Sequence, residues 1–280
     1  MKKIILLLLL SEISLQVFSQ KNYLGKKYEL SVEAGTVTIF DDSLIQNNNV
    51  EYGKFEENIS FDLFKTTNNN WFILSYENEK FDFLTLCKSA KDNKNRLWEI
   101  PYQIVKGENY SVMPELVGVN VKNVTSFVVE KNKYGKEIRY APEGKFNLFN
   151  IPWAVKTGEK NKKIIFDFGK YPGCQINYED VTELLFVNGF VDPDRPYLFK
   201  DNARVKTIRI NCKDFTFEAD LKDTGNLQSV KLPSIIKVQN NTKIQIEILD
   251  YYIGDKYNDI VLSGIFYINA ELDKISKEFD

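Results

Sequence analysis

The chain has 280 residues, of which 43% are hydrophobic and 14% aromatic, and its formal net charge is −2. This composition is typical of a globular protein of one or two domains, and the near-zero charge argues against a nucleic-acid partner. The sequence contains no histidine. Ser-His-Asp triads, Cys-His pairs and H-E-x-x-H zinc sites are therefore excluded, and catalysis would need a carboxylate, Lys, Cys or Tyr with a perturbed pKa.

Residues 1–19 have the pattern of a secretory signal peptide. Two lysines precede the apolar run Ile4–Leu10, and Val17–Ser19 provides small or modest residues before Gln20. The apolar run is far shorter than the roughly 20 residues of a membrane span. We therefore expect cleavage before Gln20 and export to the periplasm, the cell surface or the medium, with no stable membrane span in the mature protein.

Residues 20–117 are predicted to form an N-terminal β domain of unknown type. Tyr28–Val32 and Thr36–Phe40 flank a short glycine-containing turn and predict a hairpin. Asparagine triplets at 47–49 and 68–70 separate further short apolar runs. Strands at this spacing predict a small antiparallel sheet or barrel.

Residues 118–280 are predicted to form a second domain. Lys106–Asn123 contains two glycines and a proline and predicts a linker, so we place the boundary near residue 118. Beyond it, alternating apolar residues predict strands with one buried face. These residues are Ile164, Phe166 and Phe168, then Ile208, Ile210 and Cys212, then Phe215, Phe217, Ala219 and Leu221, then Ile244, Ile246 and Ile248. The expected fold class is all-β, with only Ala270–Phe279 spaced as a helix.

The three cysteines are Cys87, Cys174 and Cys212, and none belongs to a C-x-x-C pair. Zinc ribbons and thioredoxin-like redox motifs are therefore not indicated. An odd number leaves at least one thiol unpaired within the chain. Cys174 and Cys212 are the pair to test for a disulfide, and the alternative is three buried small apolar residues.

A series of short motifs follows in fixed order between residues 120 and 270. The series is Tyr140-Ala141-Pro142, Trp153, Leu185–Phe190, Tyr197, Asp201–Lys206, Leu221, Asp223, Gln228 and Tyr252–Asp259. Its most specific parts are the Asn-Gly-aromatic strand end at Asn188–Phe190, the Asn-x-Arg-Val-Lys run at Asn202–Lys206, and Tyr252–Asp259. Together they resemble the NADase-type glycan-binding domain, a discoidin-like family.

The resemblance implies a galactose-binding-like, jelly-roll β-sandwich in residues 118–280. It also implies that loops at one end of the sandwich bind the ligand, that this domain has no catalytic activity, and that no cofactor is needed. Members of the family usually carry an acidic Asp-Gly loop and Thr-x-Trp before the first long core strand. Here Asn147–Trp153 keeps only the tryptophan, so the fold is more secure than glycan binding.

Each candidate ligand-binding residue has a structural alternative. Trp153 is expected to stack on a sugar ring or to anchor the core. Asn188, with Gly189, is expected to present an amide to the ligand or to form a tight turn. Asn202, Arg204 and Lys206 alternate along one strand, where they would bind sugar hydroxyls or an acidic glycan; alternatively Asn202 caps a turn and Arg204 pairs with a structural carboxylate.

Tyr252, Asp255 and Tyr257 complete the candidate ligand-binding residues. Asp255 and Asp259 are two carboxylates four residues apart in a turn, a spacing that could place oxygen ligands around Ca²⁺. They lack the D-x-[DN]-x-[DN]-G order, so a hydrogen-bonded turn is favoured and no metal site is predicted.

The leading hypothesis is an exported, non-enzymatic protein that binds a glycan or cell-surface carbohydrate. The alternative is a structural or protein-interaction module that has lost its sugar site, as the altered Asn147–Trp153 loop suggests. A third hypothesis is a carbohydrate-active enzyme with its site in the N-terminal half, since a retaining glycosidase needs two carboxylates about 5 Å apart. The N-terminal half offers Glu56, Glu57, Asp62, Glu77, Glu79 and Asp82.

Overall fold

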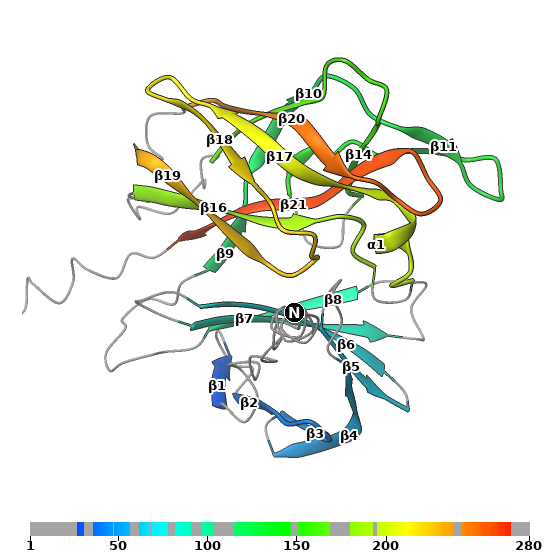
Figure 1. The fold of residues 1–280 in the computed structure, drawn as a ribbon. Coiled ribbons are helices and arrows are strands. Elements are labelled where there is room, and N and C mark those ends of the chain that lie inside the picture. Colours follow the sequence, from blue (N-terminus) through cyan, green and yellow to red (C-terminus); the bar gives the residue numbers. More distant parts are fainter. Residues whose placement is uncertain are drawn as a thin grey trace, which may run out of the picture.

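The computed structural model describes most of the chain beyond the predicted signal peptide. The described residues are 27–30, 36–46, 48–56, 62–67, 69–77, 82–90, 97–103, 115–146, 151–168, 180–192, 195–237 and 242–269. Every regular element among them except one four-residue helix is a strand, which confirms the all-β class. The strands form a small barrel and a larger sandwich above it (Figure 1). The signal peptide and the helical spacing of residues 270–279 lie outside the described residues.

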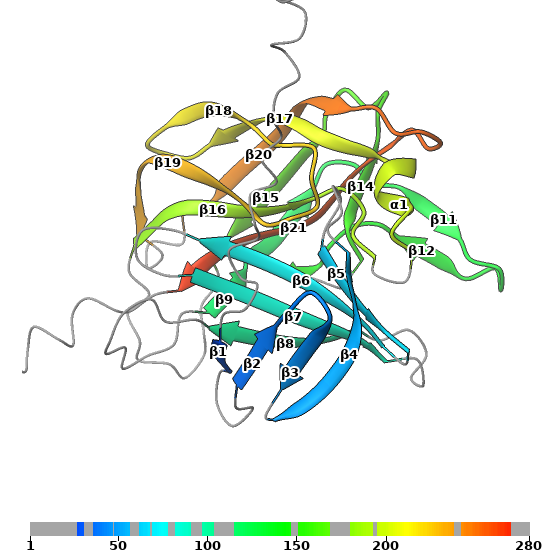
Figure 2. The same cartoon turned by 60° about the horizontal axis from the view of Figure 1, so that its bottom comes forward.

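The N-terminal strands form a closed antiparallel barrel. The strands are β1 (Lys27–Leu30), β2 (Thr36–Ile39), β3 (Ser43–Gln46), β4 (Asn49–Glu56), β5 (Asp62–Thr66), β6 (Asn69–Glu77), β7 (Asp82–Ala90) and β8 (Leu97–Gln103). Each strand pairs with the next along the chain, and β8 pairs back with β1. The predicted first hairpin is confirmed, since Tyr28 lies opposite Val37. Figure 2 shows the barrel from below.

The second domain begins before the predicted boundary at residue 118. The strand β9 (Glu115–Gly118) pairs with β21 (Asp259–Asn269), so it belongs to the C-terminal sheet. The next strand, β10 (Asn120–Val124), follows after one residue. The part of the predicted linker Lys106–Asn123 that the structure describes is therefore strand, because its glycine and valines pack against the sandwich rather than lying in solvent.

The eleven strands of the sandwich form one continuous sheet that folds into two layers. Besides β9, β10 and β21, they are β13 (Gly144–Lys145), β14 (Trp153–Lys156), β15 (Lys163–Asp167), β16 (Asp180–Asn188), β17 (Ala203–Asn211), β18 (Thr216–Asp220), β19 (Gln228–Lys237) and β20 (Ile244–Tyr252). One layer runs β13–β10–β15–β20–β17–β18, and the other joins β9 and β14 to β21, β16 and β19. A short parallel pairing of Ala203 with Ile260 connects the layers. The β-sandwich expected for the second domain is thus present.

The main core lies between the two layers. Alternating residues of β15, β17 and β20 point into it, and Ile164, Ile208 and Ile246 are fully buried, which confirms the predicted strand faces. Cys212 lies at the margin of this core as a free thiol. Because Cys212 is free, the structure does not contain the Cys174–Cys212 disulfide that the sequence offered for testing.

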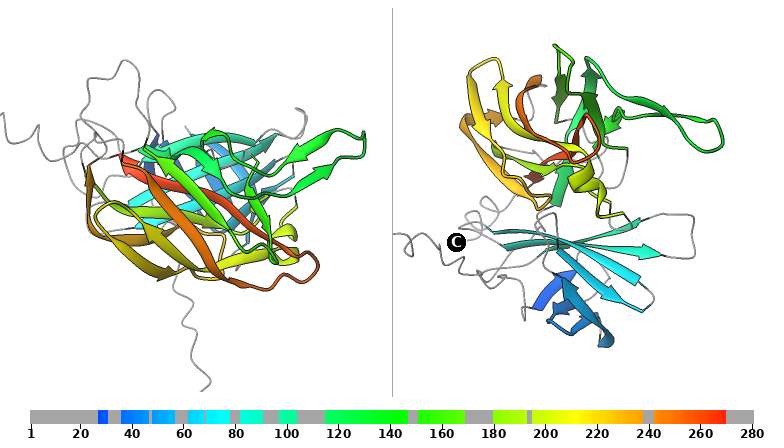
Figure 3. Two further views of the ribbon diagram at one scale, coloured as in Figure 1. Left: turned by 90° about the horizontal axis from the view of Figure 1, so that it is seen from above. Right: turned by 45° about the vertical axis from the view of Figure 1, so that its right-hand side comes forward.

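A second, small apolar cluster lies on the outer face of the β14–β21 layer. Val128, Ala154 and Val261 form it, and Tyr140 and Phe190 pack against it. From this cluster a separate two-stranded sheet projects, made of β11 (Val129–Lys131) and β12 (Glu137–Arg139) (Figures 2 and 3).

The one helix in the described part of the chain is α1 (Leu198–Asp201), which precedes β17. None of the described residues belongs to a helix long and apolar enough to span a membrane. The helix matters because its position, beside the turn between β20 and β21, fixes one end of the sandwich.

Candidate functional site

Three segments meet at one end of the sandwich, which we call the loop end. They are residues 195–204 around α1, the turn 253–258 between β20 and β21, and the loop 221–227 between β18 and β19. In Figure 1 α1 and the β20–β21 turn lie together at the right-hand side. Most residues of the motif series lie in or beside these segments.

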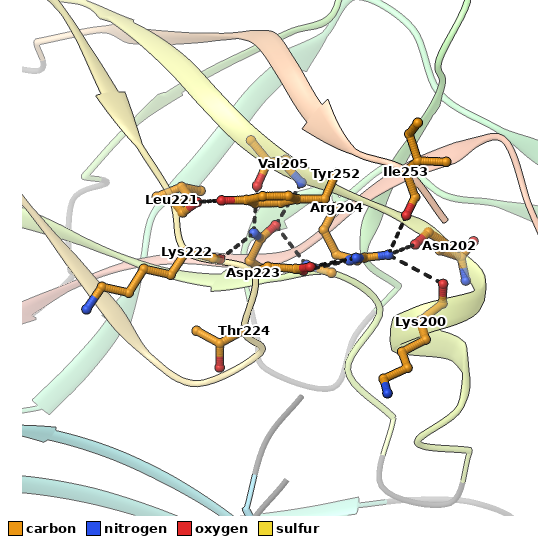
Figure 4. Close-up of polar contacts among 12 residues, drawn as sticks. Lys200, Asn202, Arg204, Val205, Leu221, Lys222, Asp223, Thr224, Tyr252 and Ile253 are labelled. Carbon is orange, nitrogen blue, oxygen red and sulfur yellow. Dashed lines mark hydrogen bonds and ion pairs between the residues drawn. The ribbon is translucent and has the colours of Figure 1, made fainter. Parts of the chain in front are cut away.

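Arg204 is the centre of the loop end. Its Nε and Nη2 donate to Oδ1 and Oδ2 of Asp223 at 2.8 and 2.7 Å, a bidentate ion pair (Figure 4). Its Nη1 donates to the carbonyl oxygens of Asn202, Ile253 and Lys200 at 2.9, 3.0 and 3.4 Å. The residue is only 7% exposed. The guanidinium therefore ties α1, the β20–β21 turn and the 221–227 loop together.

Asn188 ends β16 as a second, fully buried polar anchor. Its Nδ2 donates to the carbonyl oxygens of Val205 at 2.7 Å and Lys222 at 3.2 Å. Its Oδ1 accepts the backbone N–H groups of Gly189 at 2.9 Å and Val205 at 3.0 Å. Both hydrogens and the oxygen of the amide are thus used inside the protein, as a buried polar group requires.

Gly189 follows Asn188 with a positive φ of 73°, a conformation that favours glycine. A Cβ at this position would lie 2.6 Å from the Phe199 ring and 2.8 Å from Cγ of Arg204. Ser263 then holds the turn, since its Oγ donates to the Gly189 carbonyl at 2.7 Å. Close packing against Phe199 and Arg204 therefore requires glycine at position 189.

The loop 221–227 is held from both sides. Tyr252 on β20 donates its hydroxyl to the carbonyl oxygen of Leu221 at 3.0 Å. The side chain of Gln228 accepts the N–H of Lys222 at 2.7 Å and donates to the carbonyl of Thr224 at 3.3 Å. These bonds position Asp223, between Lys222 and Thr224, for its ion pair.

The β20–β21 turn docks on the last residues of α1 through its backbone. The N–H of Asp255 donates to the Lys200 carbonyl at 2.9 Å, and the N–H groups of Lys256 and Tyr257 donate to the Asp201 carbonyl at 3.1 and 2.7 Å. Carbonyls at the end of a helix have no partner within the helix, so the turn satisfies them. The side chains of the turn are left free to face solvent.

The exposed surface above these anchors consists of Tyr197, Ile253, Lys256 and Tyr257, which we call the loop-end patch. Tyr197, Ile253 and Tyr257 are 57%, 80% and 38% exposed. The Lys256 ammonium lies 4.9 Å from the centroid of the Tyr257 ring. A hydrogen bond with Tyr257 raises the pKa of Lys256 most strongly, and Asp201 and Tyr197 raise it further. The lysine therefore lies within electrostatic reach of both tyrosines.

Trp153 lies in the core and not in this patch. Its side chain is fully buried, and its Nε1 donates to the carbonyl oxygen of Ser126 at 2.9 Å. A sugar needs an exposed ring face to stack on, so the structure supports the core interpretation of Trp153 over the stacking one. Asn188 likewise has the structural role, because both polar atoms of its amide are engaged.

Asn202, Arg204 and Lys206 do not form one exposed row. Asn202 and Arg204 are buried and Lys206 is exposed, because α1, the β20–β21 turn and the 221–227 loop cover Arg204. Asn202 donates its Nδ2 to the Leu198 carbonyl at 2.8 Å and caps the helix end. Lys206 pairs with Asp250 at 2.8 Å, and this hydrogen bond raises the pKa of Lys206 and lowers that of Asp250. The alternative interpretation, cap and structural ion pair, matches the structure.

Asp255 and Asp259 lie in different surroundings. Asp255 is exposed, and Asp259 is buried beside Lys156, whose Nζ lies 2.6 Å from its Oδ1. No cluster of three or more metal-ligating side chains occurs among the residues that the structure describes. Of the predicted ligand-binding residues, Asp255 and Tyr257 lie exposed at the loop end, Lys206 lies exposed on β17, and Tyr252 supports the loop end from below.

The carboxylates proposed for an N-terminal active site are only partly described. Glu56 pairs with Lys65 at 2.6 Å, and Asp62 is 1% exposed. Glu57 and Glu79 lie outside the described residues, as do the side chains of Glu77 and Asp82. Of the six candidate carboxylates, the structure therefore describes the side chains of Glu56 and Asp62 alone.

Sequence reasoning did not select Tyr197 and Lys256 as binding residues. Tyr197 follows Pro196 at the start of a four-residue helix, and Lys256 lies between two residues that were selected. The signal in the sequence was a tyrosine directly after Pro196 in a turn, where an aromatic side chain has few neighbours to bury it.

The comparison with protein families finds one match, and it covers this end of the sandwich. Residues 174–268 match the family described as NAD glycohydrolase translocation F5/8 type C domain, a discoidin-like family. The match spans about a third of the chain and includes β16 to most of β21, with Asn188, Arg204 and the β20–β21 turn. No curated protein and no solved structure matches the chain significantly.

Proposed function

We propose that this chain, whose C-terminal domain is a discoidin-like module of the NAD glycohydrolase translocation family, is an exported, non-enzymatic protein that binds carbohydrate at its loop-end patch. The observation that carries the proposal is the pair of exposed tyrosines, Tyr197 and Tyr257, within electrostatic reach of Lys256, on a turn that backbone hydrogen bonds and Arg204 dock against α1. The family match and the expected signal peptide support it.

The patch has the chemistry that sugar recognition needs. A tyrosine ring offers an apolar face to the C–H face of a pyranose, and its hydroxyl can bond to a neighbouring sugar hydroxyl. Lys256 adds three donors for hydroxyl or carboxylate oxygens. Because backbone hydrogen bonds already fix Tyr257 against α1, little conformational entropy is lost when a ligand binds.

The polar groups at the loop end also support a binding role over a catalytic one. Asp223 is committed to Arg204, and the Asn188 amide is committed to the backbone. A catalytic acid or base must be free to exchange a proton with the substrate. The exposed groups that remain are two phenols, the ammonium of Lys256 and the carboxylate of Asp255, a mixture of hydrogen-bond donors and one acceptor that suits binding.

A glycan array probed with the full chain, followed by calorimetry on any hit, tests this proposal. The double variant Tyr197→Ala/Tyr257→Ala should weaken binding by about tenfold or more, since stacked aromatic contacts contribute about 0.5–1.5 kcal/mol each beyond their buried area. Tyr52→Ala is the matched control, because Tyr52 is 73% exposed but lies on β4 of the barrel. Failure of the folded protein to bind any glycan, or equal binding by the double variant, contradicts the proposal.

A second candidate function is a protein-binding or translocation module. It is favoured by the internal use of Trp153, Asn188 and Arg204, which were expected to contact sugar. The 80% exposed Ile253 then becomes the most telling side chain of the patch, because an exposed aliphatic residue suits a protein surface better than a sugar. If the chain binds a protein through this patch, Ile253→Ser should abolish binding of that protein. If it binds carbohydrate, the same variant should change glycan affinity only slightly.

A further inference from the structure

The β11–β12 hairpin is anchored firmly to the sandwich. At its base, the N–H of Val128 donates to the Ala154 carbonyl at 2.8 Å, and the N–H of Tyr140 donates to the Val128 carbonyl at 2.9 Å. The Tyr140 ring packs edge-on against Phe190, with centroids 6.2 Å apart. Among the strands that the structure describes, these two pair only with each other, and they project away from both layers (Figure 3). The hairpin is therefore a supported arm and not a part of the core.

The tip of the hairpin has a defined conformation. The side-chain Oδ1 of Asn132 accepts the N–H groups of Tyr134 and Lys136, both at 2.9 Å. The backbone of Asn132 adds two bonds, to the N–H of Gly135 and the carbonyl of Lys136, each 2.9 Å long. Gly135 supplies the positive φ of 76° that closes the turn. The side chains at the tip are thus presented by a preorganised turn.

The tip carries three exposed lysines. Lys131, Lys133 and Lys136 are exposed, and none of them takes part in an ion pair with any residue that the structure describes. Many other cations of the sandwich face a carboxylate. They include Lys122, Lys156, Lys206, Arg195 and Arg209. Glu137 lies opposite Lys131 in the strand register, but with Arg139 the hairpin has four cations against the two carboxylates of Glu130 and Glu137. This excess of positive charge at an exposed tip attracts an anion.

An exposed aromatic ring completes the tip. Tyr134 is 80% exposed, and the Lys133 ammonium lies 5.0 Å from its ring centroid. A single tyrosine among lysines gives too little apolar area to enter a lipid bilayer, and the chain as a whole, with a net charge of −2, lacks the basic character of nucleic-acid-binding proteins. An anionic polymer with pyranose rings fits both the charge and the ring.

We propose that the β11–β12 hairpin is a second binding element, which captures acidic polysaccharide chains. Carboxylates of successive uronate residues pair with Lys131, Lys133 and Lys136, and a sugar ring stacks on Tyr134. The hairpin acts without the loop-end patch, so this site does not depend on the function proposed there.

Binding of the full chain to immobilised polygalacturonate tests the proposal, with dextran as the neutral polymer. The wild type should bind polygalacturonate and not dextran, and its affinity should fall as salt is added. The triple variant K131Q/K133Q/K136Q should bind about tenfold more weakly and show little salt dependence, because three exposed ion pairs are lost. Y134A should weaken binding without changing the salt dependence.

A matched variant separates this site from bulk charge. K213Q/K231Q/K237Q removes three exposed lysines from the turn after β17 and from β19, and it should bind within about twofold of the wild type. Equal losses in the two triple variants, or no binding by the wild type, would overturn the proposal. So would capture of phosphatidylserine vesicles or single-stranded DNA by the hairpin in place of polygalacturonate.

The two proposed sites fail independently. Tyr197→Ala/Tyr257→Ala should leave polygalacturonate capture unchanged. If that double variant loses capture while K131Q/K133Q/K136Q keeps it, the acidic polysaccharide binds at the loop-end patch, which overturns the hairpin site and leaves the first proposal standing.

Discussion

The buried and the exposed halves of the loop end use similar side chains for opposite purposes. In the buried half, Arg204, Asp223 and Asn188 direct nearly all their polar atoms at each other or at the backbone. In the exposed half, Tyr197 and Tyr257 are 57% and 38% exposed, and the backbone N–H of Tyr257 is bonded to the end of α1. The comparison shows that Arg204 and Asn188, which belong to the family motif, build a platform, so the binding role that we propose falls to less distinctive neighbours.

This division has a physical reason. A polar group that is buried without a partner costs about 1–3 kcal/mol, so polar residues at the base of three converging loops must satisfy each other. That demand fixes their identity and spacing tightly. An exposed tyrosine satisfies no such demand, and many residues can take its place without loss of stability. Variants of the buried half should therefore lower the stability of the protein, and variants of the exposed half should lower ligand binding alone.

Asn188→Leu should have the largest effect on stability. It removes the acceptor for two buried N–H groups and the donor for the carbonyls of Val205 and Lys222. We expect the free energy of unfolding in urea to fall by about 3 kcal/mol or more. Asn161→Leu is the control, since Asn161 is exposed and the bonds at that position go to its backbone carbonyl. A loss below about 1 kcal/mol would show that the loop end does not depend on this amide.

Arg204→Met should have an intermediate effect on stability and a clear effect on binding. It leaves the Asp223 carboxylate and the carbonyl of Ile253 without their donor, which we expect to cost about 2 kcal/mol. The β20–β21 turn should loosen, so glycan affinity at the loop-end patch should fall even where the protein stays folded.

Arg209→Met provides the matched comparison for Arg204. Arg209 also pairs with two carboxylates, Glu218 and Glu247, but on the exposed face of β17. Its loss should lower stability less than the loss of Arg204 and should leave glycan affinity unchanged. Equal effects of the two variants would mean that burial of the guanidinium is unimportant.

The strands of the sandwich could be predicted because their burial alternates. Ile164 and Phe166, like Ile244 and Ile246, lie two residues apart with polar or half-buried residues between, and each pair is buried as expected. The barrel could be predicted only as a sheet or barrel. Its closure depends on the pairing of Leu30 with Tyr102, and alternation within a strand carries no information on which distant strand will be its neighbour.

The site was harder to predict than the fold. Arg204 and Asn188 were selected because they are polar and occur in a motif, but the motif cannot distinguish a buried, satisfied side chain from one that faces a ligand. The β11–β12 hairpin was missed for another reason. Its strands are three residues long, which is too short for an alternating pattern, and its lysines lie among the ordinary charged residues of a nearly neutral chain.

Tyr140, at the base of the hairpin, should produce the smallest effect, seen only at high pH. Burial, followed by the nearby charge of Glu130 and a hydrogen bond to it, raises the pKa of Tyr140 to about 12. The phenol of an unfolded chain ionises near pH 10. Because the folded pKa is higher, this stabilisation is complete below pH 10 and is lost as the pH rises through about 12. Between pH 9 and 12, the stability of the wild type, measured by urea unfolding, should therefore fall more steeply than that of Tyr140→Phe.

Tyr134→Phe is the control for this comparison, because Tyr134 lies at the exposed tip of the same hairpin, and its stability should follow that of the wild type. Parallel stability curves for the wild type and Tyr140→Phe would show that the base of the hairpin is as open to solvent as its tip.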